Sequence, residues 1–342
     1  MATPFAARLA VRAGMVDHPR GGRVHTDPTP YLGGLAVAVG LIVVGGIAAG
    51  AEVQLVTLLI CGLVLGATGL MDDWRTVHPL VRVGVESACG LALWIVGIRD
   101  GLFGVAALDL LLTVGFGVLI TNTVNLLDNM DGLSSGVVAI SAMTFFAIAA
   151  ERGDYLVASF ALVVAGASLG FLRHNFPPAS IFLGDAGSLM LGFFLSGLAL
   201  KLDLVGPERP VRALVVVLIL GVPLFDTLLV VIARWRGKRK IFVGGTDHSS
   251  HRLSHHGYSG RKVALVTYAA QTLSCGIALA LTSVSLVAIA VALAALSAIT
   301  VVLMLVMLRM PCPQHESGDA AVLVLPEPER SPTREGTRLE SI

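Results

Sequence analysis

Charged residues are scarce in this sequence. Only 14% of the 342 residues are Asp, Glu, Lys or Arg and 55% are hydrophobic, whereas an ordinary soluble domain carries roughly 25% charged residues. The mean hydropathy is +0.82. This composition excludes a soluble domain and indicates an integral membrane protein.

Cysteine is also rare, and no CxxC pair is present. Cys61, Cys89 and Cys275 lie inside apolar stretches, so we interpret them as packing residues. The formal net charge is only +1 and no basic stripe exists outside the connections, so no nucleic-acid partner is expected.

Long apolar runs are what the sequence does contain. They extend over about 17 to 25 residues, the length that crosses a hydrocarbon core of roughly 30 Å as a helix. Their length and their lack of polar alternation exclude a β-barrel. The sequence predicts an all-α polytopic membrane protein with about ten transmembrane helices, at 32–50, 53–70, 80–98, 107–126, 134–150, 155–172, 186–202, 210–233, 262–282 and 284–308.

Basic residues are concentrated in alternate connections, above all in 234–240. By the positive-inside rule these connections and both chain ends are cytoplasmic. We expect a cytoplasmic N-terminal segment at 1–31, without a hydrophobic core long enough for a signal peptide. A transmembrane catalytic domain follows at 32–308. Because residues 309–342 are rich in Pro, Glu, Ser and Arg, they are predicted to be a disordered cytoplasmic tail.

Four polar clusters fall on this predicted cytoplasmic side. They lie at 71–74, 121–135, 171–188 and 246–257 and hold nearly all the Asp, Asn and His near the ends of the spans. Ionisable groups in or beside a membrane are costly unless they are paired or functional. The sequence therefore predicts one site at the membrane surface.

The stretch "NTVNLLDNMDGLSSG" spaces its polar residues by three. Asn122 and Asn125 precede Asp128 and Asp131 with this spacing, so a continuing helix would place them on one face. Such a row of oxygens and amides suits a hard cation and the polar parts of a nucleotide. Helix capping is the alternative, although a cap needs only one such residue.

The stretch "MDDW" places Asp72 beside Asp73 after a purely apolar helix. Two adjacent carboxylates raise the pKa of one of them unless a cation or a donor compensates. A solvated helix end with Arg75 nearby is the alternative.

In "IFLGDAGS", small residues surround Asp185 where a new helix is predicted to begin. Gly184, Gly187 and Ser188 would let backbone N–H groups approach phosphate oxygens. Asp185 would then hold a magnesium ion that bridges those oxygens. Phe182 would be a stacking platform for a base or, alternatively, an aromatic residue of the membrane interface.

The connection at 234–262 carries the densest positive charge and four histidines. We expect anion binding, because the neighbours are Arg and Lys rather than cysteines or carboxylates. A zinc site formed by His248 and His251 is an alternative, and for the run 234–240 so is an anchor for anionic lipid.

These motifs resemble the polyprenyl-phosphate N-acetylhexosamine-1-phosphate transferases of glycosyltransferase family 4. "NTVNLLDNMDGL" is similar to the family signature N-x-x-N-x-x-D-G-L-D-G-L, "MDDW" to its aspartate pair and "NFPPASIFLGDAGS" to its N-x-P-A-x-h-F-h-G-D-x-G-S stretch. "VHTDPTPYLGG" resembles its first cytoplasmic loop, and "PLFDTLLVVIAR" resembles the span before its histidine loop. The resemblance covers roughly residues 15 to 262, with the motifs in the family's order.

The sequence also departs from the family pattern. Asn129 and Met130 replace Gly and Leu of the signature, Ser250 replaces the middle histidine of H-x-H-H-R, and Arg23 stands where a lysine is expected before His25. The histidine loop favours the UDP-GlcNAc:undecaprenyl-phosphate branch over the muramoyl-pentapeptide branch, whose loop resembles P-x-H-H-H. The family has a transmembrane helix before the segment "GMVDHP", and we expect an upstream extension of the reading frame to encode it.

The resemblance implies a reaction. A UDP-N-acetylhexosamine, most simply UDP-GlcNAc, would donate its sugar-1-phosphate to a polyprenyl phosphate, undecaprenyl or decaprenyl, and UMP would leave. The product would start a lipid-linked glycan of lipopolysaccharide, teichoic acid or arabinogalactan type in a bacterial inner membrane, with Mg²⁺ or alternatively Mn²⁺ as cofactor. A homodimer is an open expectation.

The resemblance also implies roles for residues. The implied catalytic residues are Asp72, Asp73, Asp128, Asp131, His248, His251 and Arg252. The implied substrate-binding residues are Arg23, His25, Asn122, Asn125, Asn175, Phe182, Gly184 and Ser188. The implied metal ligands are Asp185 and Asp131.

Alternatives stay open at this stage. The same chemistry could use another UDP-sugar, such as UDP-MurNAc-pentapeptide, and could proceed in one step or through a covalent aspartyl-phosphate. An ion-coupled secondary transporter is the rival class, but transporters bind near the bilayer midplane. Here the acids of the polar clusters sit at span ends on one side, and Asp226, inside the eighth predicted span, is the main exception. A catalytically inactive scaffold is disfavoured because all three acidic motifs are intact.

Overall fold

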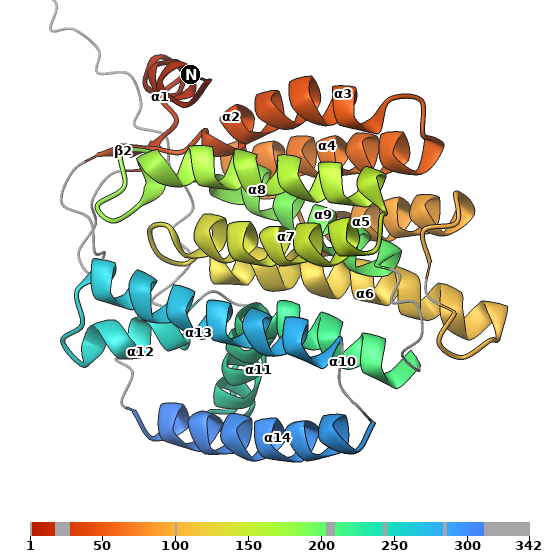
Figure 1. Cartoon of the computed structure of the whole chain (residues 1–342). Coiled ribbons are helices and arrows are strands. Elements are labelled where there is room, and N and C mark those ends of the chain that lie inside the picture. Colours follow the sequence, from red (N-terminus) through yellow and green to blue (C-terminus); the bar gives the residue numbers. More distant parts are fainter. Residues whose placement is uncertain are drawn as a thin grey trace, which may run out of the picture.

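Helices make up nearly all of the computed structural model, which describes residues 2–17, 28–99, 101–202, 209–241, 245–282 and 286–310. Figure 1 shows the long helices running side by side, with α11 crossing them. The helices are α1 (Ala2–Arg12), α2 (Gly33–Gly40), a π-helical turn η1 (Leu41–Gly45), α3 (Gly46–Ala49), α4 (Val53–Trp74), α5 (Pro79–Ile95), α6 (Ala106–Leu127), α7 (Leu133–Glu151), α8 (Tyr155–Asn175), α9 (Gly184–Lys201), α10 (Arg209–Ile219), α11 (Gly221–Arg236), α12 (Ser249–His255), α13 (Gly260–Leu281) and α14 (Leu286–Arg309).

The prediction of an all-α polytopic membrane protein is confirmed. Among the described residues, six helices are long and apolar enough to cross a membrane, and α10 with α11, bent by 79°, would make a seventh. The predicted number of ten is not confirmed. The segment 32–50 forms three short pieces, 80–98 forms the 17-residue α5, and α9 carries Asp185 and Lys201 at its two ends.

Two short strands connect the segment after α1 to the segment that precedes α9. Strand β1 (Val16–Asp17) pairs antiparallel with β2 (Thr29–Pro30), with Val16 opposite Pro30. Residues 30–34 then bond to the segment before α9: Phe182 N donates to Pro30 O at 2.8 Å, and Gly33 N donates to Phe182 O at 2.9 Å. This pairing fixes the entry into α9.

Helix α9 is the centre of the bundle. All residues from 186 to 200 are buried, and α4, α6, α2 and α7 pack around them. Close approach requires glycine: a Cβ on Gly69 of α4 would lie 2.3 Å from the Asp185 carbonyl oxygen, and a Cβ on Gly192 would lie 2.8 Å from Thr121 Cα. The backbones of α4 and α6 therefore lie directly against α9.

A buried side-chain amide supplies hydrogen-bond partners to the backbone groups at the bend between α10 and α11. Gln271 of α13 is 0% exposed. Its Nε2 donates to Ile219 O, at the end of α10, at 2.6 Å, and its Oε1 accepts from Val222 N, in the first turn of α11, at 3.1 Å. Ser141 Oγ also donates to Ile219 O. These bonds replace the helical bonds that the bend removes, because buried backbone groups must find partners.

Candidate active site

The aspartate pair at the end of α4 meets the start of α9. Asp73 accepts hydrogen bonds from Asp185 N at 2.9 Å and Ala186 N at 3.1 Å. We predicted that the N–H groups of this helix start would approach phosphate oxygens. In the structure, two of them are bonded to the Asp73 carboxylate, which occupies the position favoured for an anion at a helix N-terminus.

Gly184 makes this contact between α4 and α9 sterically feasible. Its φ is +72°, a conformation that favours glycine, and a Cβ there would lie 2.6 Å from Asp73 Oδ2. We predicted that Gly184 would make room for substrate. In the structure it makes room for the Asp73 carboxylate.

Arg82 of α5 joins the acidic motifs, and sequence reasoning missed it. Its Nη1 lies 3.2 Å from Asp72 Oδ2 and 3.4 Å from Asp185 Oδ2, and its Nη2 donates to Asn122 Oδ1 at 3.2 Å. The second oxygen of Asp72 accepts from Val77 N at 2.7 Å. One guanidinium of α5 therefore contacts side chains of α4, α6 and α9.

Glu86, one turn after Arg82, was also missed. It is 0% exposed, accepts from Asn122 Nδ2 at 2.5 Å, and lies 3.8 Å from Arg82 Nε. A carboxylate inside an apolar stretch is costly unless it is paired. Glu86 and the spacing of four from Arg82 were the signal in the sequence that could have identified this pair.

Asn125 orients Asp185 from the other side. Its Nδ2 donates to Asp185 Oδ1 at 2.8 Å and to Ser188 Oγ at 2.9 Å, and Ser188 Oγ donates to Gly184 O at 3.1 Å. The Asp185 side chain keeps 35% exposure. Its carboxylate is thus fixed by Asn125 and Arg82 but stays accessible to a ligand.

Asp128 and Asp131 lie in the turn between α6 and α7. Burial, together with the negative charges of Asp185, Asp73 and Asp131, raises the pKa of Asp128 well above its usual value. Asp131 Oδ2 accepts from Ala179 N at 2.9 Å. The structure therefore brings the three acidic motifs together around the start of α9.

The donor set is suited to a hard cation. Among the residues described, no three His, Cys, Asp or Glu side chains meet in an arrangement that could hold a metal ion. Magnesium, however, is usually bound by one or two carboxylates together with substrate phosphates. Burial, and after it repulsion by the neighbouring carboxylates, raises the pKa of Asp128, and a cation would relieve this repulsion. The residues present fit a magnesium ion completed by substrate oxygens.

Asn175, which we predicted to lie near the nucleotide, is bonded to the protein. It is 2% exposed; its Oδ1 accepts from Gly132 N and Ser135 Oγ, and its Nδ2 donates to Ile181 O. It ties the α6–α7 turn to the segment before α9. Phe182, in that segment, is half-buried.

The histidine loop, residues 246–257, is anchored to α11. Asp226, 1% exposed, lies 2.7 Å from His248 Nδ1 and accepts from Ser249 N at 2.8 Å and from Ser249 Oγ at 2.6 Å. The rings of His248 and His251 are 5.9 Å apart. Burial and the neighbouring His248 lower the pKa of His251. Asp226 thus joins α11 to the start of α12 through hydrogen bonds.

In the segments that the structure describes, Arg252 is bonded to the main chain and not to the acidic residues at the start of α9. It is 5% exposed and bonded to main-chain oxygens of Asp247 and of the end of α14. Asp247 accepts from Arg239 and Arg234, and although burial raises the pKa of Asp247, these two arginines outweigh the effect and lower it. The predicted residues Arg23 and His25, like the tail beyond 310, lie outside the described residues.

Comparison with known proteins identifies the family. The model of glycosyl transferase family 4 matches residues 55–203. The chain is 35% identical to the probable undecaprenyl-phosphate N-acetylglucosaminyl 1-phosphate transferase of Bacillus subtilis, over 78% of this chain and 77% of that protein. It is 34% identical to the decaprenyl-phosphate N-acetylglucosaminephosphotransferase of Mycobacterium tuberculosis, over 78% and 76%. The chain belongs to glycosyl transferase family 4.

A relative with a different name is also similar. A phospho-N-acetylmuramoyl-pentapeptide-transferase of Synechococcus is 29% identical over 80% of this chain and 82% of that protein. As a family 4 protein, the chain is a phosphoglycosyltransferase, and the predicted family resemblance is confirmed.

Two departures from the family pattern contact each other. Ser250 Oγ donates to Asn129 Oδ1, and Asn129 Nδ2 donates to Leu126 O at 2.8 Å. The residue that replaces a family histidine thus bonds to the residue that replaces a family glycine. This contact joins the histidine loop to the turn that carries Asp128 and Asp131.

Proposed function

We propose that this family 4 enzyme transfers N-acetylglucosamine-1-phosphate from UDP-N-acetylglucosamine to a polyprenyl phosphate, releasing UMP. The observation that carries the proposal is the convergence of three acidic motifs and Arg82 around the start of α9. The names of the most similar relatives support this sugar and this class of lipid. The product would start a lipid-linked glycan of the bacterial cell envelope.

The acidic cluster needs positive charge when two phosphate-bearing substrates bind. Asp185 and Asp131 would hold Mg²⁺, with Mn²⁺ as a substitute, and Asp128 would lie beside them. When bound, the metal would neutralise phosphate oxygens and lower the barrier to phosphoryl transfer. Arg82 carries a fixed positive charge beside Asp185 and Asp72, so it would bind a phosphate oxygen of the donor or of the acceptor.

The transfer itself requires mainly positioning. A phosphate oxygen of the lipid attacks the β-phosphorus of the UDP-sugar, the bond from that phosphorus to the bridging oxygen breaks, and UMP leaves with the bonding electrons. A phosphate monoester has its second pKa near 6 and is largely ionised at pH 7, so a strong base is unnecessary. Asp72 and Asp73 therefore orient the acceptor, and the fixed donors stabilise the developing charge.

The geometry also separates the proposal from the rival class. The carboxylates gather at one end of the helices rather than at mid-height, where transporters bind their substrates. Transfer to the same lipid from UDP-MurNAc-pentapeptide is a second candidate, because a transferase of that name is 29% identical. The proposed site faces the cytoplasm of the inner membrane: basic connections are cytoplasmic by the positive-inside rule, and Arg239 of the basic connection at 234–240 is bonded to Asp247, close in sequence to Ser250, which bonds to Asn129 of the α6–α7 turn.

A UMP-release assay tests the proposal. Purified protein with magnesium should release UMP from UDP-N-acetylglucosamine only when polyprenyl phosphate is present. A parallel assay with UDP-MurNAc-pentapeptide decides between the two donors. Release of UMP without the lipid, or no release with either donor, would refute the proposal.

A further inference from the structure

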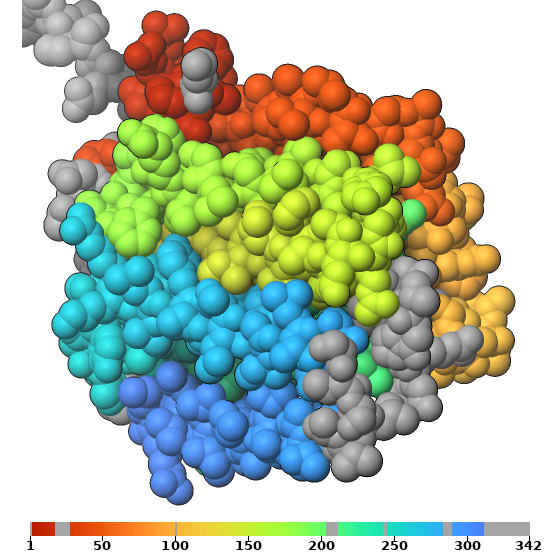
Figure 2. All heavy atoms as spheres, viewed as in Figure 1, coloured from red at the N-terminus to blue at the C-terminus, as the bar shows by residue number. Residues whose placement is uncertain are grey.

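Helix α14 lies at the edge of the molecule and contributes no side chain to the acidic cluster in the described part of the chain. Figure 2 shows it along the surface. Only 11% of its most apolar stretch is buried, and it packs chiefly against α11. The few packing contacts of α14 therefore do not identify a role for this helix in the enzyme.

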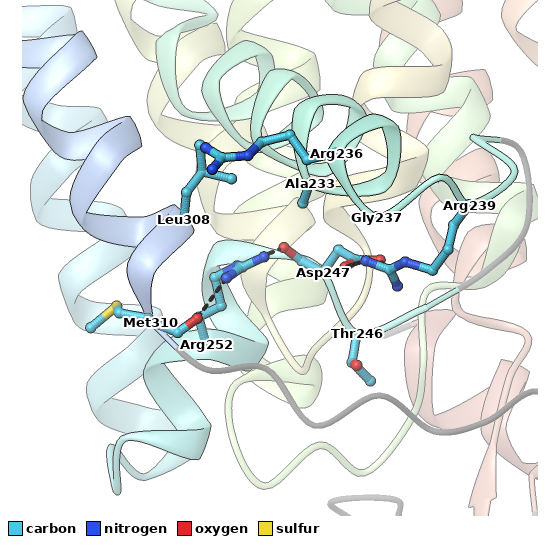
Figure 3. Close-up of a pocket in the computed structure, with 9 residues that line it drawn as sticks. All are labelled: Ala233, Arg236, Gly237, Arg239, Thr246, Asp247, Arg252, Leu308 and Met310. Carbon is cyan, nitrogen blue, oxygen red and sulfur yellow. Dashed lines mark hydrogen bonds and ion pairs between the residues drawn. The ribbon is translucent and has the colours of Figure 1, made fainter.

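The end of α14 is bonded to the histidine loop. Arg252 Nη1 donates to Met307 O at 2.9 Å and to Met310 O at 2.7 Å, and Arg252 Nε donates to Asp247 O at 3.0 Å. Figure 3 shows the bond from Arg252 to Met310. The last carbonyl groups of a helix lack helical partners and form the negative end of its dipole. A buried guanidinium there makes charge-assisted hydrogen bonds, which are the strong ones.

A pocket of about 240 Å³ lies at this junction, lined in part by Arg236, Arg239, Arg252 and Leu308 (Figure 3). Three arginines around one pocket are typical of an anion site. However, Arg239 donates to both oxygens of Asp247, and Arg252 is bonded to main-chain carbonyls. Two of the three guanidinium groups therefore have protein acceptors, and the junction is a brace between elements.

Helix α12 lies within the histidine loop and needs contacts with other elements to be stable. It has seven residues, and a helix this short is not stable by itself. Asp226 holds His248, and Asn129 holds Ser250 beside the α6–α7 turn. Arg252 supplies an anchor on a third element, α14.

We propose that α14 is a strut for the histidine loop and that Arg252 is a positioning residue, not one that contacts substrate. Its guanidinium joins α12 to the carbonyl groups at the end of α14 and so keeps His248 and His251 in place beside the α6–α7 turn. The inference rests on the proposed function only in the measurement of UMP release; the measurement of amide exchange does not depend on it.

The test breaks the strut from each side in the full-length chain. Arg252→Ala removes the guanidinium. Arg309→Pro disrupts the last turn of α14, because proline lacks the N–H, clashes with the carbonyl four residues earlier and shifts the preceding residue out of helical geometry. Arg309 is exposed, so Arg309→Ala removes the same side chain, keeps the helix and is the matched control.

Two readouts are expected to agree. Arg252→Ala and Arg309→Pro should each lower kcat about tenfold to a hundredfold, with the KM for UDP-N-acetylglucosamine changed by less than about twofold, as for a displaced catalytic element. The double variant should be no slower than the slower single variant, because both changes remove one interaction. Amide exchange of residues 248–255 should accelerate in both single variants and stay unchanged in Arg309→Ala.

Other outcomes would overturn the proposal. A raised KM with an unchanged kcat in Arg252→Ala would show that Arg252 contacts the donor. Multiplicative effects in the double variant, or parent-like exchange and rate in Arg309→Pro, would show that α14 braces nothing. If Arg252→Ala is poorly made, Arg252→Lys replaces it, since one ammonium cannot span the three carbonyl oxygens. Amide exchange needs no substrate, so it tests the strut even if the parent releases no UMP.

Discussion

Replacing Arg82 by Gln tests the cluster at the residue that links its helices. The change removes one positive charge 3.2 Å from Asp72 and 3.4 Å from Asp185 and keeps a polar side chain of shorter reach. At these distances and an effective dielectric constant of about 20, each ion pair has a gross Coulomb energy of about 5 kcal/mol. Desolvation offsets much of this, because the arginine side chain is only 22% exposed.

The catalytic effect follows from what Arg82 does for the substrates. Loss of one fixed donor to developing charge costs about 3 to 4 kcal/mol in other enzymes, which corresponds to a rate loss of about a hundredfold to a thousandfold. We therefore expect Arg82→Gln to release UMP at least about a hundredfold more slowly than the parent. Arg82→Lys keeps the charge without the planar fork and should lie between them.

The assay is UMP release at saturating UDP-N-acetylglucosamine and polyprenyl phosphate, with detergent-extracted protein checked for a parent-like elution profile. Arg75→Gln is the matched control, because Arg75 is exposed at the same end and stacks over Trp74 at 5.2 Å. A rate for Arg82→Gln within about tenfold of the parent would mean that Arg82 only joins helices. An equal loss in Arg75→Gln would assign the effect to surface charge.

Three further outcomes are expected. Asp185→Asn should be inserted but about a thousandfold slower, since it removes a charge that would hold magnesium, and raising magnesium should restore little; a loss below tenfold would place the metal elsewhere. Because the folded-state pKa of Asp128 is raised, its contribution to stability is present below the unfolded pKa and is lost as pH rises through the folded pKa. Asp128→Asn should therefore raise the midpoint of thermal unfolding at pH 8 without magnesium, by an amount that shrinks toward pH 5; an equal gain at both pH values would contradict this. In a background without native cysteines, Arg152→Cys should react with an impermeant thiol reagent from outside intact cells and His251→Cys only after permeabilisation, and the reverse pattern would invert the topology.

Much of the site could be predicted because ionisable residues are costly in a membrane and therefore conspicuous. Asp73, Asp128 and Asp185 are distant in the sequence. Asp73 and Asp128 lie where α4 and α6 end, Asp185 lies where α9 begins, and the structure brings these helix ends together. Arg82 was missed because an arginine beside a span end also satisfies the positive-inside rule. Only its contacts with the two aspartates reveal the second role.

Features that depend on tertiary contacts could not be predicted. Hydropathy predicted the positions of the helices, but the number of ten spans is not confirmed. A fully buried helix such as α9 is apolar through protein packing, so its apolar sequence alone does not indicate lipid contact. The bend between α10 and α11 is bridged by Gln271, which lies 52 residues after Ile219 and 49 residues after Val222 along the chain. The bonds of Arg252 to the end of α14 leave no trace in either local sequence.

The burial of α9 has a consequence for how the enzyme responds to its lipid environment. Residues 186–200 are shielded from the bilayer by other helices, so hydrophobic mismatch with a thinner or thicker membrane does not act directly on the backbone that carries Asp185. Mismatch acts instead on peripheral helices such as α14, which tilt to adapt. Asp185 should thus keep its position across bilayers of different acyl-chain length better than the histidine loop, which is bonded to the end of α14.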